Sequence, residues 1–388
     1  MTDRPAPLGA VLTVTFLGSL SGGVFWAAIF FVTAGHYGFS PARNLVLAAV
    51  MGTVYALTAA TAGRLMRTVL ARLAPRAVLQ AALATWTVAG VLPLLLAGEP
   101  VMWLSGLLGA LASAITWPVV ESYLGAGRHG AAMRAAIGWF NVTWTPAVAA
   151  GLLLLPLVSR VSDLGPLALS AAGSAAALLA TRMLPLYPGA HEAAAAEAAV
   201  GPEYPRLRQA AQWLLPFSYV LCAAMSPVLP HRLTELGAGD AAGTIAALWM
   251  LARFVTLAAM WRTGFWHGRW GTLALGTASL ALGFAAILLA PSLAGLAAAL
   301  VIFGSGMGLT YYASLYYALA VGHAEVDAGG NFEALIGVGY LGGPLLGVAA
   351  GAALPTHTAG ATVGLALLVM GVGSAGAFAA YLAARRAR

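Results

Sequence analysis

The stretch that decides the fold is "PVMWLSGLLGALASAITWPVVESYLG" at residues 100–125. Residues 100–120 contain no charged side chain, and Glu121 is the first one to follow. A helix needs about 20 predominantly apolar residues to cross a bilayer core of about 30 Å, so this run predicts a transmembrane helix. A carboxylate inside such a run costs several kcal/mol unless it is paired, protonated or hydrated. Glu121 is therefore a candidate functional residue.

The composition extends this prediction to the whole chain. Of 388 residues, 61% are hydrophobic and only 8% are charged, and the mean hydropathy is +0.88. A soluble domain carries about 25% charged residues, so the composition indicates an integral membrane protein. The net charge of +7 comes entirely from arginines. They are scattered along the chain, which argues against nucleic-acid binding, and Cys222 as the only cysteine excludes an internal disulfide.

Eleven further apolar runs are long enough to span a membrane, which gives twelve in all. They are continuous and rich in Ala, Leu and Gly rather than alternating, so they predict helices and not the strands of a membrane barrel. The runs lie near residues 8–33, 44–63, 77–97, 100–125, 135–158, 164–184, 210–233, 240–261, 271–290, 293–320, 332–353 and 360–383.

The arginines predict the orientation of these spans. With the N-terminus in the cytoplasm, fifteen arginines lie inside, Arg43, Arg160 and Arg232 lie outside, and Arg253 lies within a span. Cytoplasmic loops carry an excess of basic residues. We therefore expect both termini to be cytoplasmic, in a bacterial inner membrane.

The least apolar connector, residues 187–209, falls between the sixth and seventh runs and suggests two six-helix halves at 1–186 and 210–388. A shift of the sequence by 194 residues places "ITWPVVESYLGAGRH" (115–129) over "LTYYASLYYALAVGH" (309–323). This weak internal similarity pairs the fourth run with the tenth, as a duplication of six helices requires.

Twelve spans, cytoplasmic termini, a central linker and a repeat of six helices resemble the major facilitator superfamily. The segment "GRLMRTVLARLAPRAVL" (63–79) is similar to the family's loop after the second span, with Arg64, Arg67, Arg72 and Arg76 but without the family's aspartate. The segment "RTGFWHGRW" (262–270) is a second loose copy. "GYLGGPLLG" (339–347) fits a glycine–proline pattern that family antiporters carry in the fifth span, whereas here it lies in the eleventh. The resemblance implies an all-α membrane fold of two six-helix bundles around a cavity lined by the first, fourth, seventh and tenth spans.

The glycine–proline stretch also has a direct physical interpretation. Gly339, Gly343 and Gly347 share one helix face, which lets a neighbouring helix approach closely. Pro344 removes a backbone hydrogen bond and permits a bend. A gating helix and ordinary tight packing both fit this pattern.

Arg253 lies about 12 Å from the inner end of its span, which is too deep for its head group to reach the membrane surface. It therefore faces either a hydrated cavity or a carboxylate. In the first case it binds an anionic or strongly hydrogen-bonding substrate group, which suits its planar set of donors. In the second case it forms a structural ion pair between helices.

Aromatic and amide side chains supply the other candidates for substrate binding. Tyr312 and Tyr316 share a helix face in the tenth run, and rings with hydroxyl tips suit an aromatic or amphipathic solute. Packing against other helices, or a place at the membrane interface, is the alternative. The remaining candidates of this kind are Tyr311, Trp117, Asn141, Trp144 and Trp26.

Glu121 and Glu333 lie about one turn inside the cytoplasmic ends of their spans. Glu121 pairs with an arginine from 64–76 or with Arg128 to lock a cytoplasmic gate, or it carries a coupling proton, or it stays passive near the lipid headgroups. Glu333 is its expected equivalent in the second half.

The sequence predicts a secondary transporter that moves a small organic solute by alternating access. Proton-linked export of amphipathic compounds is the first hypothesis, and import or facilitated passage of a sugar or organic anion is the second. A non-transporting receptor, scaffold or lipid-handling protein is the third. We found no nucleotide-binding loop, nucleophile triad or metal-ligand spacing, so we expect no enzyme, cofactor or metal. The expected partners are the solute, membrane lipid and, under the proton-linked hypothesis, protons as the coupling ion, and we expect a monomer.

Overall fold

The structure is a computed structural model that describes residues 5–68, 72–128, 130–189, 203–321, 326–353, 370–371, 373–379 and 382. These residues form helices, connected by turns and short loops, and no strand. The all-α prediction is therefore confirmed. In order, the α-helices are α1 (Leu8–Gly35), α2 (Pro41–Arg67), α3 (Pro75–Leu95), α4 (Glu99–Gly125), α5 (Gly130–Val161), α6 (Gly165–Ala180), α7 (Tyr204–Met225), α8 (Leu229–Glu235), α9 (Ala242–Arg262), α10 (Trp270–Leu289), α11 (Leu293–Val321) and α12 (Val326–Ala353).

Nine helices in the described part of the chain are long and apolar enough to cross a membrane, and α7 with α8 forms a tenth span bent by 45°. Pro227 lies at this break and has no backbone N–H, so it cannot continue the helical hydrogen bonding of α7. Helix α6, with 16 residues, is the shortest of the predicted spans. The predicted run at 360–383 lies almost entirely outside the described residues.

Several helices are longer than the apolar runs that predicted them. Helix α5 extends over 130–161 where the run covers 135–158, and α12 begins at Val326 where the run begins at 332. An apolar run marks only the part of a helix inside the hydrocarbon, whereas backbone hydrogen bonding continues into the interface. Helix α7 likewise begins at Tyr204, so the predicted linker 187–209 ends in helix. Residues 190–202 lie outside the description.

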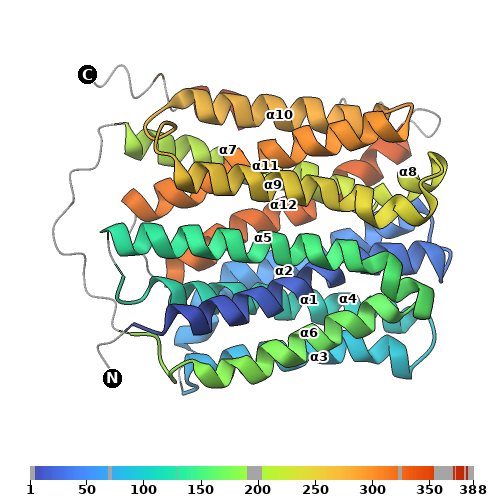
Figure 1. Cartoon of the computed structure of the whole chain (residues 1–388), viewed down its shortest axis with the longest axis horizontal. Helices are drawn as coiled ribbons and strands as arrows, with labels where there is room; N and C mark the ends of the chain where they lie inside the picture. The colour runs from blue at the N-terminus through green and yellow to red at the C-terminus, as the bar shows by residue number, and fades with distance from the viewer. Residues whose placement is uncertain are drawn as a thin grey trace.

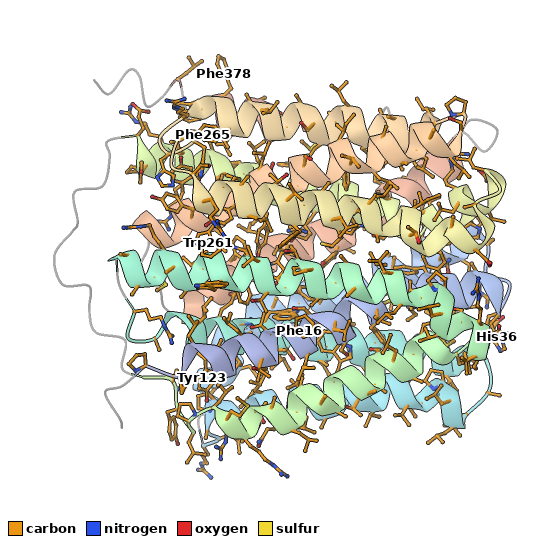
Figure 2. The ribbon with its side chains drawn as sticks, viewed as in Figure 1. Phe16, His36, Tyr123, Trp261, Phe265 and Phe378 are labelled. Carbon is orange, nitrogen blue, oxygen red and sulfur yellow. The ribbon has the colours of Figure 1, made fainter. Side chains whose placement is uncertain are left out.

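The helices pack as two groups (Figure 1). Among the first six, α1 contacts α5 and α6, α3 contacts α4 and α6, and α2 contacts α4. Among the later helices, α7 contacts α11 and α12, and α11 contacts α9 and α10. The groups meet along two long helix pairs, α2 with α12 and α5 with α9. Figure 2 places Tyr123 and Phe378 near one end of the bundle and His36 at the other.

Glycines allow α12 to lie directly against its neighbours. A Cβ atom on Gly339 would meet the carbonyl oxygen of Pro216 in α7 at 2.8 Å, and one on Gly347 would meet Leu45 of α2 at 2.8 Å. Gly52 of α2 lies against the backbone of Tyr340. The glycine face of 339–347 therefore serves close helix contacts, and its gating role stays a prediction.

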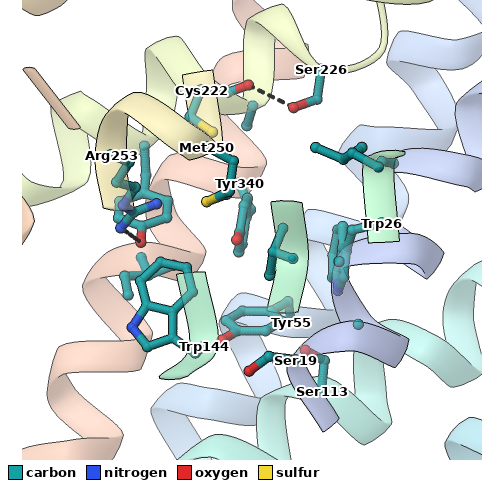
Figure 3. A pocket seen from close by; sticks show the side chains of 18 of the residues that line it. Ser19, Trp26, Tyr55, Ser113, Trp144, Cys222, Ser226, Met250, Arg253 and Tyr340 are labelled. Atoms are coloured by element: carbon teal, nitrogen blue, oxygen red, sulfur yellow. Dashed lines mark hydrogen bonds between the residues drawn. The ribbon is translucent and has the colours of Figure 1, made fainter. Parts of the chain in front are cut away.

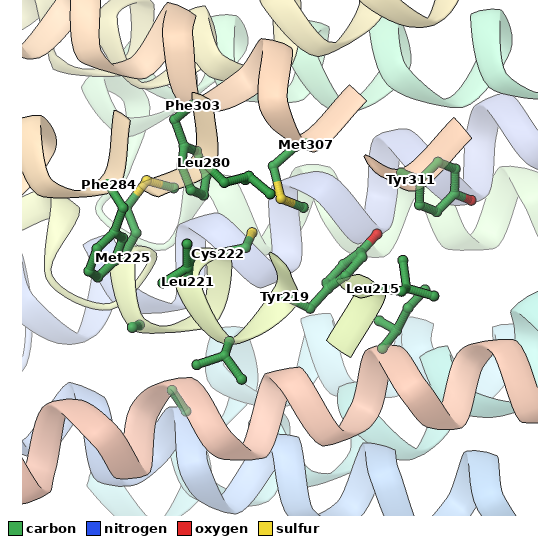
Figure 4. Packing of buried hydrophobic residues seen from close by; sticks show 14 of the residues in the cluster. Leu215, Tyr219, Leu221, Cys222, Met225, Leu280, Phe284, Phe303, Met307 and Tyr311 are labelled. Carbon is green, nitrogen blue, oxygen red and sulfur yellow. The ribbon is translucent and has the colours of Figure 1, made fainter. Parts of the chain in front are cut away.

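The buried side chains around α7 form an ordinary apolar core. Met225 and Cys222 pack in one cluster with Leu280, Phe284 and Phe303 (Figure 4). This packing fixes the C-terminal half of α7 against α10 and α11, and Cys222 and Met225 also reach the cavity between the two helix groups.

Candidate functional site

A central cavity lies between the two helix groups, with about 210 Å³ of space for the centres of water-sized molecules. One water needs about 10–15 Å³ on this measure, so the cavity has room for a small organic molecule. Its walls come from both groups: α1, α2, α4 and α5 on one side, and α7, α9, α11 and α12 on the other. Figure 3 shows side chains from these helices converging on the same space.

Arg253 from α9 lies in this cavity wall and is only 2% exposed. Its Nη2 donates a hydrogen bond of 3.0 Å to the hydroxyl of Tyr219. The guanidinium carbon lies 4.6 Å from the ring centroid of Trp144 and 4.6 Å from that of Tyr311. Aromatic rings therefore hold the cation in place through cation–π attraction.

No carboxylate of the described residues lies within salt-bridge distance of Arg253, and its Nε has no hydrogen-bond partner. A buried cation normally pairs with an anion, because desolvation costs several kcal/mol. The structure thus shows no ion pair between Arg253 and a described carboxylate, and the role of Arg253 stays a prediction. Its Nε–H group lacks an acceptor among the described residues.

A cluster of aromatic rings forms the wall between α1, α2 and α12. Trp26 stacks on Tyr340, with centroids 5.0 Å apart and planes 13° from parallel. Tyr55 meets Trp26 edge-on at 5.9 Å and Tyr340 at 5.2 Å. Tyr219 meets Tyr340 edge-on at 5.5 Å. Such packed rings give the cavity a rigid, mostly apolar surface with hydroxyl tips.

The two embedded carboxyl groups face the same cavity. Glu333 is 5% exposed and accepts a hydrogen bond from the hydroxyl of Tyr55, so α12 and α2 are joined across the two helix groups. Glu121 interacts electrostatically with Glu333 but has no hydrogen-bond or ion-pair partner among the described residues. The structure therefore brings together two carboxyl groups that the sequence placed in separate halves.

Helix α4 presents one polar stripe to the cavity. Ser113, Trp117 and Glu121 recur every four residues, share a helix face and all line the cavity. Ser19 of α1 also lines the cavity (Figure 3), and its hydroxyl has no hydrogen-bond partner among the described residues. Sequence reasoning singled out Trp117 and Glu121 but missed Ser113, although the spacing that links all three was visible.

Two of the predicted binding tyrosines lie elsewhere. Tyr311 lines the cavity, whereas Tyr312 and Tyr316 pack against Trp266, with ring centroids 5.6 and 4.9 Å away. Tyr316 also stacks on His267 at 4.5 Å. The prediction for Tyr312 and Tyr316 needs this correction: they share a face as expected, but that face covers the loop between α9 and α10.

Trp26, Trp117 and Trp144 line the cavity, as does Pro344. Asn141 lies beside it: the side-chain oxygen accepts a 2.9 Å hydrogen bond from Nε1 of Trp144, and Nδ2 has no partner. Asn141 thus orients a ring that covers Arg253. The residues that sequence reasoning missed are Tyr55, Tyr219, Tyr340, Cys222 and Ser19.

The arginines at the Tyr123 end do not pair with Glu121 in this structure. Arg128 is 8% exposed and donates 3.0 and 2.9 Å bonds to the carbonyls of Tyr123 and Leu124, and a further one to Ala6. It caps α4, and burial lowers the pKa of its guanidinium. Arg76 donates a 3.0 Å bond to the carbonyl of Leu184. Arg64 and Arg72 are exposed, and the side chain of Arg67 lies outside the described residues.

At the opposite end, Arg43 pairs with Glu99, and Arg160 of α5 pairs at 2.6 Å with Asp240 before α9. The second pair joins the two helix groups. Both pairs are well exposed, so they contribute at most about 1 kcal/mol each. Both pairs lie at the end of the bundle that holds His36, away from the cavity wall that contains Glu121.

The helix arrangement of this chain is similar to those of solved transporter structures. The nucleoside transporter NupG matches with a TM-score of 0.68 at 14% identity, over 97% of this chain and 98% of that one. The human organic anion transporter MFSD10 matches with a TM-score of 0.61 at 17% identity, over 95% and 100%. A bacterial homologue of the human lysosomal transporter Spinster, inward-facing and unoccupied, matches with a TM-score of 0.63 at 13% identity, over 97% and 96%. All three belong to the major facilitator superfamily.

The chain has the major facilitator fold. No model of a protein family matches the sequence, and no curated protein matches it significantly. The resemblance stated from the loops and the glycine–proline stretch is therefore confirmed at the level of the fold. Within the major facilitator fold of this chain, the cavity takes residues from α1, α4, α7 and α11, and also from α2, α5, α9 and α12.

Proposed function

We propose that the protein is a secondary transporter that carries a small organic solute through the central cavity by alternating access. The observation that carries this proposal is Arg253, a buried cation in a cavity wall without a carboxylate partner among the described residues. Retaining such a group costs stability, and embedded ionisable residues in membrane proteins mark substrate or ion pathways. A ligand acceptor that binds Arg253 offsets the cost during transport.

The arrangement of the helices supports the same proposal. The cavity lies where two helix groups meet, and each group supplies part of its wall. Rocking of one group against the other would expose such a site first to one side of the membrane and then to the other. The proposed division at the 187–209 linker makes each group one six-helix half.

Arg253 favours a solute with an anionic or strongly accepting group. The similar structures include a transporter of nucleosides and one of organic anions, and both solute classes offer acceptors of this kind. The aromatic walls favour an amphipathic body. Proton-linked export and import down a gradient both fit this cavity, with Glu121 and Glu333 as the groups that gate it or carry the proton.

The proposed location is the bacterial inner membrane, with the Tyr123 end in the cytoplasm. Arg64, Arg76, Arg182 and Arg262 lie at that end of their helices, while Arg43, Arg160 and Arg232 lie at the other. This distribution follows the excess of basic residues in cytoplasmic loops. The glycine face of α12 would then lie beside the path that opens and closes.

A non-transporting receptor or scaffold on this fold is the remaining candidate, and it predicts a cavity filled with apolar side chains. The open cavity and its embedded charges argue against it.

The test has two stages. Purified protein is screened by thermal unfolding against metabolites and drugs at two pH values, because a ligand of the folded state raises apparent stability. Each hit is then tested for counterflow in proteoliposomes, with and without a pH gradient. Accumulation that Arg253→Gln abolishes supports transport, whereas ligands that bind in the cavity and never cross the membrane refute it.

A further inference from the structure

Three ionisable side chains line the cavity, and two of them, on different walls, have no hydrogen-bonded or ion-paired partner of opposite charge in the described part of the chain; the third, Glu333, accepts from Tyr55. Arg253 projects from α9 and Glu121 from α4. They do not form an ion pair with each other. Tyr311 lines the same cavity, and its ring lies 4.6 Å from the guanidinium carbon of Arg253. The space between the two groups is therefore polar at both ends.

The donor end is fully defined by contacts. Rings cover Arg253 at Trp144 and Tyr311, and Tyr219 occupies one of its N–H groups. The Nε donor is buried and unpartnered. A carboxylate accepts two parallel hydrogen bonds from a guanidinium edge, which makes it the group that best completes this end.

The acceptor end lies on the first helix group. Tyr55 donates to Glu333, whereas Glu121 next to it has no donor. Ser19 and Ser113 add hydroxyl groups on the same side. The described residues of this wall offer acceptors and no cation. A ligand ammonium group would therefore pair with this wall, just as a ligand carboxylate would pair with Arg253.

We propose that the solute is amphoteric: its carboxylate binds Arg253, its ammonium group binds Glu121, and an aromatic or apolar body fills the space between them. This inference rests on the proposed function and specifies its substrate class. It follows that such a solute joins both helix groups at once, whereas a simple anion or cation engages only one of them. Arg253 and Glu121 both gain a partner of opposite charge only in the loaded cavity.

The experiment uses ligands that share a body and differ only in charge. For a phenyl body they are L-phenylalanine, 3-phenylpropionate and phenethylamine, and for an indole body L-tryptophan, indole-3-propionate and tryptamine. We expect one or both zwitterions to raise the unfolding temperature of the purified protein. The matching anion and cation should bind about ten- to a hundredfold more weakly, the effect of one charge-assisted hydrogen bond.

Two variants test which cavity residue binds each charged group of the ligand. Glu121→Gln should remove the advantage of the zwitterion over the anion, and Arg253→Gln should remove its advantage over the cation. Glu99→Gln and Arg160→Gln change exposed charges at the far end of the bundle and should leave both ratios unchanged. The ligand series on the unmodified protein answers the question even if a cavity variant fails to fold.

The inference is overturned if an anion or a cation binds as tightly as its zwitterion, if Glu121→Gln keeps the full discrimination, or if no zwitterion of the series binds. Counterflow in proteoliposomes separates this inference from the proposed function. A solute of another charge class that binds and crosses the membrane leaves the transporter intact and refutes the amphoteric substrate. A zwitterion that binds with the predicted pattern but never crosses the membrane supports the amphoteric ligand and refutes the transporter.

Discussion

Neighbouring glycines in α12 make a sharp test of how α12 packs against α7 within the second helix group. A Cβ atom on Gly343 would collide with the backbone of α7: it would lie 2.5 Å from the nitrogen of Ala224 and closer still to the carbonyl oxygen of Val220. A Cβ atom on Gly342 would meet only the Cγ2 methyl of Val220, at 3.1 Å. The two positions share one helix and differ in what they face.

The size of the effect follows from these distances. Ordinary Cβ contacts begin at 3.4 Å, so Gly343→Ala must push α12 from α7 by more than 0.9 Å against backbone that cannot rotate away. Overpacking of this kind costs about 1–3 kcal/mol, which for 388 residues corresponds to a fall of about 1–4 °C in unfolding temperature. Both substitutions gain the same helix propensity, about 1 kcal/mol, so their difference isolates the collision.

The assay is thermal unfolding followed with a thiol-reactive dye, because the only cysteine, Cys222, is buried. We expect Gly342→Ala to match the unmodified protein or exceed it, and Gly343→Ala to unfold at a lower temperature than Gly342→Ala. Equal unfolding temperatures for the two variants would mean that α7 and α12 are not in backbone contact at Gly343. The reasoning on close helix approach would then fail.

Three further predictions use matched sites. Tyr311→Phe should weaken binding of a cavity ligand about three- to tenfold through loss of one hydroxyl, whereas Tyr312→Phe, outside the cavity, should change it less than about twofold; equal effects in a titration would contradict the assignment. Burial and the nearby Arg134 lower the pKa of His267 below 6.5, so the folded state binds fewer protons than the unfolded one and stability falls as the pH drops through 6.5; His267→Gln should reduce the difference in unfolding temperature between pH 7.5 and 5.5, and an unchanged difference would exclude this histidine as its source. In a Cys222→Ala background, Ser162→Cys should react with an impermeant thiol reagent on intact cells and Thr263→Cys should not; the reverse pattern would invert the orientation.

The apolar runs predicted the helices well because the bilayer imposes one length on them and demands that every backbone group bond within its own helix. The depth of Arg253 and the position of Glu121 inside a span followed from counting residues along those runs. Such counting is one-dimensional, and it is accurate because a helix rises regularly with each residue.

Which face of each helix meets the cavity could not be predicted in the same way. In a soluble helix the polar face marks the solvent, but here lipid and helix contacts are apolar and the cavity walls are mostly so. Tyr312 and Tyr316 illustrate the limit: their shared face was correct and its neighbour, Trp266, was not foreseen. Tyr55, Tyr219 and Tyr340 were missed for the related reason that a lone tyrosine in an apolar run gives no sign of its partner.

The hydrogen bond from Tyr55 to Glu333 links the candidate site to the mechanical contact between the helix groups. It crosses from α2 to α12, along the same interface where Gly52 meets the backbone of Tyr340. Glu333 in turn interacts with Glu121 in the cavity wall. A rocking motion that separates α2 from α12 at this level must break the hydrogen bond from Tyr55 to Glu333. A ligand cation bound to Glu121 would change the electrostatic potential at Glu333, the acceptor of that bond. In the proposed transport cycle, ligand binding and helix movement would therefore both act on Glu333, although an apolar side chain would pack at this glycine-lined helix crossing at lower cost.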